Sequence, residues 1–345
     1  MSKKIVFCAD GTWNHPKSPA IVSGADTNVY KLYKSLAVTP SQFTAYDDGV
    51  GADGLPLERL IGGAFGVGLF QKIKDGYTAI AHVYEEGDAI YIFGFSRGAY
   101  TARSLAGMIA ICGLPTQNFN QSFVDAVFNA YRNTNQRKEI LAGLASYNLS
   151  DAKITMLGVW DTVGALGIPG ALFDDSKFNY GFLDTSLHPD VQAAYHALSI
   201  DERRPEFQPT LWTSSPSGSQ IINQVWFAGV HSDIGGGYSE PGLSNITLSW
   251  MLNKAIQHGI ETLPAAIAIY GRIDPVHSLD CMHESWNVFW GFPKKRLLPD
   301  HTIPSGATIA NSVQIRLLGD IGYRPSNLNI DNSGQLLGYT SETVI

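Results

Sequence analysis

Cysteine and charge are both scarce in this sequence. Three cysteines, Cys8, Cys112 and Cys281, are scattered over 345 residues. They are too few and too far apart for a disulfide framework, so we expect reduced thiols. Charged residues make up 16% of the chain and the net charge is −7. The basic residues form no cluster beyond residues 294–296, and a nucleic-acid partner is therefore not expected.

Long apolar runs and metal-binding patterns are also missing. The apolar run Ile5–Ala9 near the N-terminus is too short for a signal peptide, and no stretch approaches the length of a membrane span. We therefore expect a protein made in a cytoplasm, without a signal peptide or transmembrane helix. No Cys/His cluster has the spacing of a zinc site, so we expect no metal and no other cofactor.

The composition present is that of a globular protein with a sizeable core. Apolar residues make up 44% of the chain, and no Pro/Ser-rich linker divides it. We predict a single elaborated domain over residues 1–345. Its motif-bearing core covers about 4–250, with residues 251–345 packed on it as C-terminal helices and loops.

The strongest local signal lies between residues 89 and 110. Residues 89–93 are apolar or aromatic and predict a buried strand, while small and apolar residues recur at helical spacing after residue 97. Between them, GFSRG at 94–98 has the Gly-x-Ser-x-Gly spacing of a nucleophile elbow. Glycines two residues either side of Ser96 relieve the crowding of a serine at positive φ. Ser96 is thus a candidate nucleophile; the alternative is a turn residue whose hydroxyl caps the helix.

Strands and helices alternate along the rest of the chain. This pattern predicts an α/β fold, α/β-hydrolase-like, with a mostly parallel central sheet, helices on both faces and long lid-like insertions. We expect further strands at 4–9, 43–46, 153–160 and 224–230, and an edge strand at 312–318. Helices are expected at 28–36, 69–84, 189–198 and 244–258, and a lid-like loop at 165–184. The glycines of 60–70 permit either close backbone packing or a mobile apolar loop.

Polar residues follow two later strands. Asp161 comes directly after the strand 153–160, and His231 directly after 224–230. The carboxyl ends of parallel strands meet at one edge, so both are expected beside Ser96, in the chain order of α/β-hydrolase triads. In such a triad the histidine removes the proton of the serine hydroxyl, and the carboxylate orients the histidine ring. Asp233 is the alternative acid, although its closeness to His231 favours a role in bracing the glycine loop.

The first strand ends in another polar turn. Asp10 follows the strand 4–9 and precedes Gly11 and Thr12, which places this turn at the ligand-binding edge of the sheet. Asp10 either closes an Asx-type turn or lines the active site, and the spacing favours neither. Strand placement makes Gly11 or Thr12 a candidate second donor to an oxyanion.

Five ordered motifs within about residues 4–250 resemble a known family. They are FCADGTWN, GFSRGAYTARSLAG, LGVWDTVGALG, ALSIDERRPEF and VWFAGVHSDIGGGY. This set resembles the DUF2235 family, the α/β-hydrolase catalytic region of bacterial type VI secretion phospholipase effectors of the Tle1 class. The resemblance implies phospholipid ester hydrolysis by a triad of Ser96, Asp161 and His231. It also implies an oxyanion hole that includes the Arg97 backbone N–H.

The resemblance implies partners as well as chemistry. They are an ester or phospholipid substrate, a secretion adaptor or spike protein and an immunity protein, with export by a type VI secretion system. The aromatic segment 285–295 is either a transient membrane-surface anchor or a core-packing segment.

Two alternatives to a phospholipase or lipase acting through an acyl-enzyme stay open. One is a soluble carboxylesterase or thioesterase for small acyl groups. The other is a non-catalytic interaction module that keeps the fold without the chemistry.

Overall fold

The computed structural model describes residues 2–11, 25–49, 63–163, 186–286 and 303–345. Its centre is an eight-stranded sheet in the order β10-β9-β8-β7-β6-β3-β1-β2, and every neighbouring pair is parallel. The strands are β1 (Lys4–Ala9), β2 (Gln42–Asp47), β3 (Ala89–Phe95), β6 (Ile154–Trp160), β7 (Ala193–Ser199), β8 (Ile221–Phe227), β9 (Thr308–Ala310) and β10 (Thr340–Glu342). The fold class is therefore the predicted α/β arrangement around a parallel sheet.

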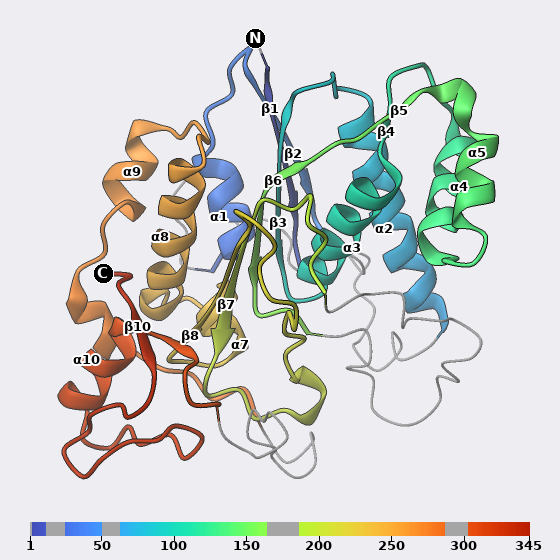
Figure 1. Cartoon of the computed structure of the whole chain (residues 1–345). Helices are drawn as coiled ribbons and strands as arrows, with labels where there is room; N and C mark the ends of the chain where they lie inside the picture. The colour runs from blue at the N-terminus through green and yellow to red at the C-terminus, as the bar shows by residue number, and fades with distance from the viewer. Residues whose placement is uncertain (1, 12–24, 50–62, 164–185, 287–302) are drawn as a thin grey trace.

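Helices cover both faces of this sheet (Figure 1). One layer contains α2 (Gly63–Ala81), α3 (Arg97–Cys112), α4 (Gln121–Arg132) and α5 (Arg137–Gly143), and the other contains α1 (Asn28–Ser35), α8 (Gly242–Gln257), α9 (Pro264–Tyr270) and α10 (Asn311–Gly319). A short antiparallel pair, β4 (Leu114–Pro115) with β5 (Leu149–Ser150), lies outside the main sheet.

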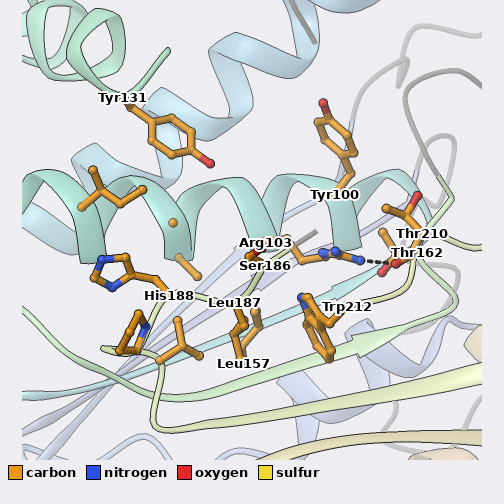
Figure 2. Close-up of a pocket in the computed structure, with 15 residues that line it drawn as sticks. Tyr100, Arg103, Tyr131, Leu157, Thr162, Ser186, Leu187, His188, Thr210 and Trp212 are labelled. Atoms are coloured by element: carbon orange, nitrogen blue, oxygen red, sulfur yellow. Dashed lines mark hydrogen bonds between the residues drawn. The ribbon is translucent and has the colours of Figure 1, made fainter. Parts of the chain in front are cut away.

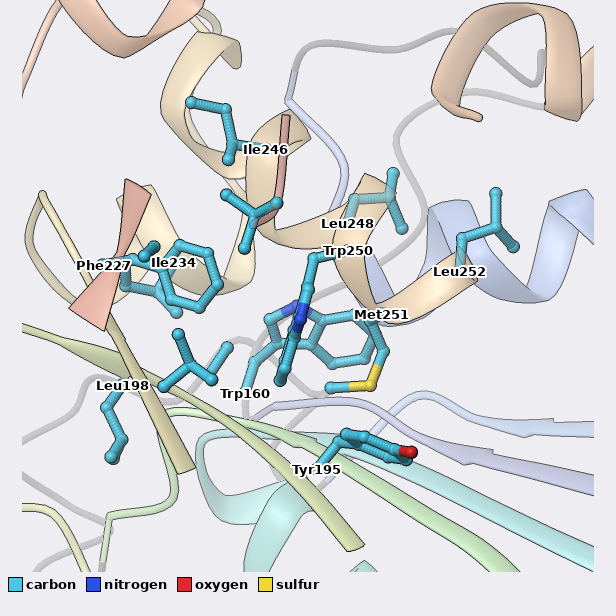
Figure 3. Close-up of a cluster of buried hydrophobic side chains, with 14 of the residues drawn as sticks. Trp160, Tyr195, Leu198, Phe227, Ile234, Ile246, Leu248, Trp250, Met251 and Leu252 are labelled. Atoms are coloured by element: carbon cyan, nitrogen blue, oxygen red, sulfur yellow. The ribbon is translucent and has the colours of Figure 1, made fainter. Parts of the chain in front are cut away.

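The two faces of the sheet bury two separate apolar clusters. Val6 and Phe93 point to the cluster under α1 and α8, while Phe7 and Ile92 point to the cluster under α2, α3 and α4. Successive side chains of a strand alternate between faces, so a central strand must be apolar throughout. Figure 3 shows the first cluster, where Trp250 of α8 packs over Tyr195 and Phe227.

The order of the strands creates a switch point between β1 and β3. The chain leaves β1 toward β2 on one side and leaves β3 toward β6 on the other, so the connections from the carboxyl ends of β1 and β3 run in opposite directions. In open α/β sheets, ligands bind at the carboxyl edge next to such a switch point. The residues that follow β1 and β3, Asp10 and Ser96, lie at this point.

The helix predicted over 189–198 is wrong, because residues 193–199 form β7 in the centre of the sheet. The alanines of this segment favour helix intrinsically. All seven residues of β7 are buried, so the sequence lacks the apolar–polar alternation of a half-buried strand. Pairing with β6 and β8 on its two sides overrides the local propensity.

The edge strand predicted over 312–318 is also wrong, since these residues lie in α10. Ser312, Val313, Arg316 and Leu317 are buried there, which is the i, i+1, i+4, i+5 pattern of a helix face. Arg316 is a charged residue on the buried face of α10, which hid the helical pattern in the sequence. Its guanidinium is satisfied inside the protein, because it donates to the Ser278 and Asp280 carbonyls.

The helix predicted from residue 69 starts earlier than expected. α2 begins at Gly63, so part of the glycine-rich segment is helical and not a loop. The predicted lid-like loop at 165–184 and most of the aromatic segment 285–295 lie outside the described residues.

Candidate active site

The turn between β3 and α3 has the geometry of a nucleophile elbow. Ser96 has φ 58° and ψ −120°, a conformation that costs a non-glycine residue free energy. A Cβ at Gly94 would lie 2.4 Å from the Gly98 carbonyl oxygen, and one at Gly98 would lie 2.2 Å from the Ala9 carbonyl oxygen. Both positions therefore require glycine: Gly94 for the crowding within the turn that the sequence predicted, and Gly98 because the backbone at the end of β1 approaches it.

Three side chains meet at the carboxyl edge of the sheet. His231 Nε2 lies 2.8 Å from Ser96 Oγ, and His231 Nδ1 lies 2.6 Å from Asp161 Oδ2. All three residues are buried, with Asp161 fully so. The structure thus brings together the serine, histidine and aspartate selected from the sequence, in hydrogen-bonding contact along one line.

Asp161 is fixed by hydrogen bonds to the neighbouring strand β7. It follows β6 directly and has φ 39°, and its N–H donates to the Ala197 carbonyl of β7. Its second carboxylate oxygen, Oδ1, accepts the Ser199 N–H at 3.0 Å. One oxygen is thereby occupied by the backbone, which leaves the other for His231.

His231 is packed between aromatic rings at the start of α7 (His231–Gly235). The Phe95 ring centroid lies 4.6 Å from the imidazole, and the Phe207 centroid lies 4.9 Å away, edge-on. Burial lowers the pKa of His231, and the Asp161 carboxylate opposes that shift. Because burial dominates, the imidazole is neutral at pH 7 and can accept a proton.

The ion pair between Glu202 and Arg204 holds His231 in place. Glu202 is fully buried and forms a bidentate contact with Arg204, at 3.0 Å to Nε and 2.9 Å to Nη2. Glu202 Oε2 also accepts the His231 backbone N–H at 3.2 Å. Arg204 stacks 3.5 Å over the Phe207 ring, which contacts His231. The ion pair therefore holds both the backbone and the ring environment of His231.

Sequence reasoning assigned no role to Glu202, Arg204 or Phe207. All three lie in the segment ALSIDERRPEF, which contributed to the family resemblance. A run of four charged residues reads as a solvated turn from sequence alone. The strand before this segment, β7, was predicted as a helix, so its position at the carboxyl edge of the sheet could not be read from the sequence.

Asp10 braces the loops around the site. Its Oδ2 accepts the Tyr46 hydroxyl at 2.7 Å and the Thr27 hydroxyl at 2.5 Å, while Oδ1 accepts the Gly11 N–H at 2.6 Å. These bonds connect β1, β2 and the start of α1. The Gly11 N–H proposed as an oxyanion donor is directed at Asp10 in this structure, and Thr12 lies outside the described residues.

Asp233, the alternative acid, pairs with a different histidine. Its Oδ1 lies 2.6 Å from His283 Nδ1, and its Oδ2 accepts the Val230 and His283 N–H groups. The described contacts of Asp233 thus brace the start of α7 and do not include the His231 ring. His283 in turn stacks on Tyr238 at 3.8 Å.

Two kinds of feature are absent from the described residues. No group of three or more His, Cys, Asp or Glu side chains in this part of the chain is arranged to hold a metal ion. Among the helices described, none is long and apolar enough to cross a membrane.

Comparison with known families decides the family of this chain. The family model described as type VI secretion system (T6SS) phospholipase effector Tle1-like, catalytic domain, matches residues 3–254. This chain belongs to the Tle1-like catalytic domain family. The matched region of this Tle1-like domain contains Ser96, Asp161 and His231, together with the Glu202–Arg204 pair.

Relatives of this Tle1-like domain include a eukaryotic protein. An uncharacterized protein of Saccharomyces cerevisiae, YEL023C, is 30% identical over 240 residues, which is 62% of this chain and 33% of the yeast protein. The chain therefore spans about a third of that relative's length.

Two solved structures are also similar. An uncharacterized protein from Pseudomonas aeruginosa has 18% identity and a TM-score of 0.45, over 80% of this chain and 50% of that one. A Tle1 effector, solved bound to the VgrG spike of the type 6 secretion system, has 20% identity and a TM-score of 0.39, over 69% and 51%.

Proposed function

We propose that this Tle1-like domain is a serine ester hydrolase of the phospholipase type that works through an acyl-enzyme intermediate. The observation that carries the proposal is the continuous contact from Ser96 Oγ through the His231 ring to Asp161 Oδ2, at 2.8 and 2.6 Å. Serine, histidine and carboxylate in this order form the constellation that activates a hydroxyl for acyl transfer.

In the first step, Ser96 Oγ attacks the ester carbonyl carbon while His231 Nε2 takes the hydroxyl proton. The imidazolium then gives that proton to the leaving alcohol, and the acyl group stays on Ser96. Water repeats the sequence in the second step and releases the free acid. Asp161 holds the Nδ1–H tautomer and stabilises the imidazolium without itself becoming protonated.

The developing oxyanion needs donors close to Ser96. Arg97 is the first residue of α3, and the residue after the nucleophile supplies a backbone N–H to the oxyanion in this class of elbow. The positive end of the α3 dipole adds to this stabilisation. The second donor is proposed to come from the segment after β1.

Membership of a family described as phospholipase effectors supports a phospholipid substrate. It likewise supports export by a type VI secretion system and a spike partner. An immunity protein and a transient membrane-surface contact stay predictions from the sequence resemblance.

The test compares wild type with Ser96→Ala and His231→Ala on short and long acyl esters and on phosphatidylcholine vesicles. We expect each substitution to lower kcat by about 10⁴ or more, while circular dichroism and the melting temperature stay close to wild type. Turnover by folded Ser96→Ala equal to that of wild type would refute the proposal. Serine-dependent activity on short soluble esters alone would keep the mechanism and remove the phospholipid assignment.

A further inference from the structure

A cavity of about 200 Å³ lies beside α3 in the described part of the chain (Figure 2). One wall is a single stripe of α3, and the opposite wall is formed by residues 186–191 and 210–212. Leu157 of β6 forms part of the floor. The cavity therefore lies over the sheet on the α3 side.

Small side chains on α3 create this space. Tyr100, Arg103, Ala106, Gly107 and Ile111 line the cavity, and their spacing places them along one face of a helix. The two smallest, Ala106 and Gly107, occupy the middle of the stripe. A Cβ at Gly107 would lie 2.9 Å from the Tyr131 hydroxyl. A side chain larger than glycine at this position would therefore crowd Tyr131.

One end of the cavity adjoins the proposed triad. Thr162, which lines that end, directly follows Asp161, and Tyr100 lies one helical turn beyond Ser96 on α3. The Thr210 N–H donates to the Thr162 carbonyl at 3.0 Å, which holds these two lining residues side by side at this end. Figure 2 shows Thr162 and Thr210 at this end and Tyr131 and His188 at the other.

Polarity changes along the length of the cavity. At the Thr162 end, the Arg103 guanidinium donates to the Thr210 carbonyl and stacks 5.0 Å from the Trp212 ring centroid. The Thr162 hydroxyl is buried and has no hydrogen-bond partner among the described residues. Leu157, Leu187 and Val191 provide an apolar wall farther along, and Tyr131 and His188 line the opposite end. The end near the proposed triad thus suits a polar group, and the apolar wall suits hydrocarbon.

We propose that this cavity holds the acyl chain of the scissile ester, with the ester at the Thr162 end. The proposal rests on the esterase function proposed above. An apolar cavity of about 150 Å³ holds a six-carbon ring, so the described cavity of about 200 Å³ holds about eight carbons. Ala106, Gly107 and Leu187 then set the preferred length of the chain.

The experiment measures kcat/KM for p-nitrophenyl esters from butyryl to dodecanoyl in wild type and two variants of opposite effect. Ala106→Leu fills the cavity, and each buried methylene that is displaced costs about fourfold. We therefore expect the octanoyl-to-butyryl ratio to fall at least tenfold. Leu187→Ala enlarges the cavity and is expected to move the optimum two to three carbons longer.

Control substitutions of the same kind outside the cavity test whether the change in chain-length preference depends on position. Leu141→Ala and Ala142→Leu make the same changes on α5, outside the cavity, and should leave the ratio unchanged. Calorimetric titration with octanoate adds a readout that does not require turnover. Wild type should bind octanoate, and Ala106→Leu should bind it at least tenfold more weakly.

Chain-length profiles that are identical in wild type, Ala106→Leu and Leu187→Ala would overturn the cavity assignment and leave the esterase intact. Failure of wild type to bind octanoate would overturn it as well. Octanoate binding that Ala106→Leu abolishes, without serine-dependent hydrolysis of any ester, would support the cavity and refute the esterase. The two proposals therefore fail separately.

Discussion

At the scale of single residues, the site is marked by backbone conformations that side chains rarely adopt. In the described part of the chain, the non-glycine residues at positive φ are Ser96, Asn148 and Asp161. Two of these three belong to the proposed triad. Each such conformation costs about 1–3 kcal/mol, and surrounding contacts must hold it. Strain at both the proposed nucleophile and the proposed acid is consistent with a site selected for geometry over stability.

The first prediction concerns the pH dependence of His231. Burial lowers its pKa below the ordinary value of 6.5, and the neutral imidazole is the active base. We expect kcat/KM to stay high as pH falls to 6.5 and to decline below it. Protonation in the unfolded state begins first, so stability also declines as pH falls through 6.5.

A pH–rate profile, measured with an ester that does not itself titrate, locates the acid limb, which is the decline of kcat/KM at low pH. Asp161→Asn provides the comparison, because the wild-type Asp161 carboxylate raises the pKa of His231 and the variant lacks it. The limb should move to still lower pH in this variant, together with a kcat about 10⁴ lower. A wild-type limb centred above pH 6.5 would contradict the assignment of His231 as a buried neutral base.

At the scale of elements, the elbow depends on the loop after β1 as much as on α3. Our second prediction is that Gly98→Ala disrupts the site, because the new Cβ would lie 2.2 Å and 2.4 Å from the Ala9 and Asp10 carbonyl oxygens. Such overpacking against backbone costs about 1–3 kcal/mol or more. The displaced elbow should lower kcat by about 10². Gly143→Ala on α5 meets nothing within 4 Å, so it should change neither urea stability nor rate by a comparable amount.

The segment after β7 is a second positioning element. Our third prediction is that Glu202→Gln destabilises the protein by about 1–3 kcal/mol, because it removes the charge of the fully buried Glu202 carboxylate from its bidentate contact with the partly buried Arg204. It should also lower kcat more than it changes KM, because Glu202 holds the His231 backbone. Glu85→Gln, which alters an exposed pair with Lys3, is the control and should cost under 1 kcal/mol. Equal urea midpoints for the two variants would contradict this role.

The elements show where the sequence was sufficient and where it was not. The sequence predicted β1, β3 and α3 well. Their apolar runs match their burial in the structure, and the glycines of the elbow mark where β3 ends and α3 begins. β7 was missed because a strand buried on both faces has no alternation, and α10 because a buried arginine disguised its apolar face. The three residues of the proposed triad, which the structure brings into contact, could be selected from their positions after strands. The contact of Glu202 with His231 could not be predicted, because a sequence does not distinguish a buried charged residue from an exposed one.

At the scale of the whole molecule, the sheet extends beyond the region that matches the family model. β9 pairs with β8 at residues 308–309, and β10 pairs with β9 near the C-terminus. Ile309, Val313 and Leu317 are buried in the same cluster as α8. We therefore propose that residues 251–345 belong to one cooperative unit with the catalytic motifs.

The fourth prediction follows from this continuity. A fragment of residues 1–254 should fail to fold, because it exposes the edge of β8 and the apolar surface that β9 and α10 cover. The full chain should unfold in a single transition with coincident circular dichroism and fluorescence signals. A soluble 1–254 fragment with wild-type esterase activity would show that the C-terminal part is separate.

The central claim is that Ser96 is an activated nucleophile, and covalent labelling tests it most directly. We would treat the wild type, Ser96→Ala and His231→Ala with a fluorophosphonate and follow the intact mass, with peptide mapping of the modified residue. The account predicts one adduct per chain on Ser96, formed at least 10²-fold more slowly in His231→Ala and absent in Ser96→Ala. A wild-type protein that stays unlabelled, or that is labelled at another residue while Ser96 stays free, would contradict it.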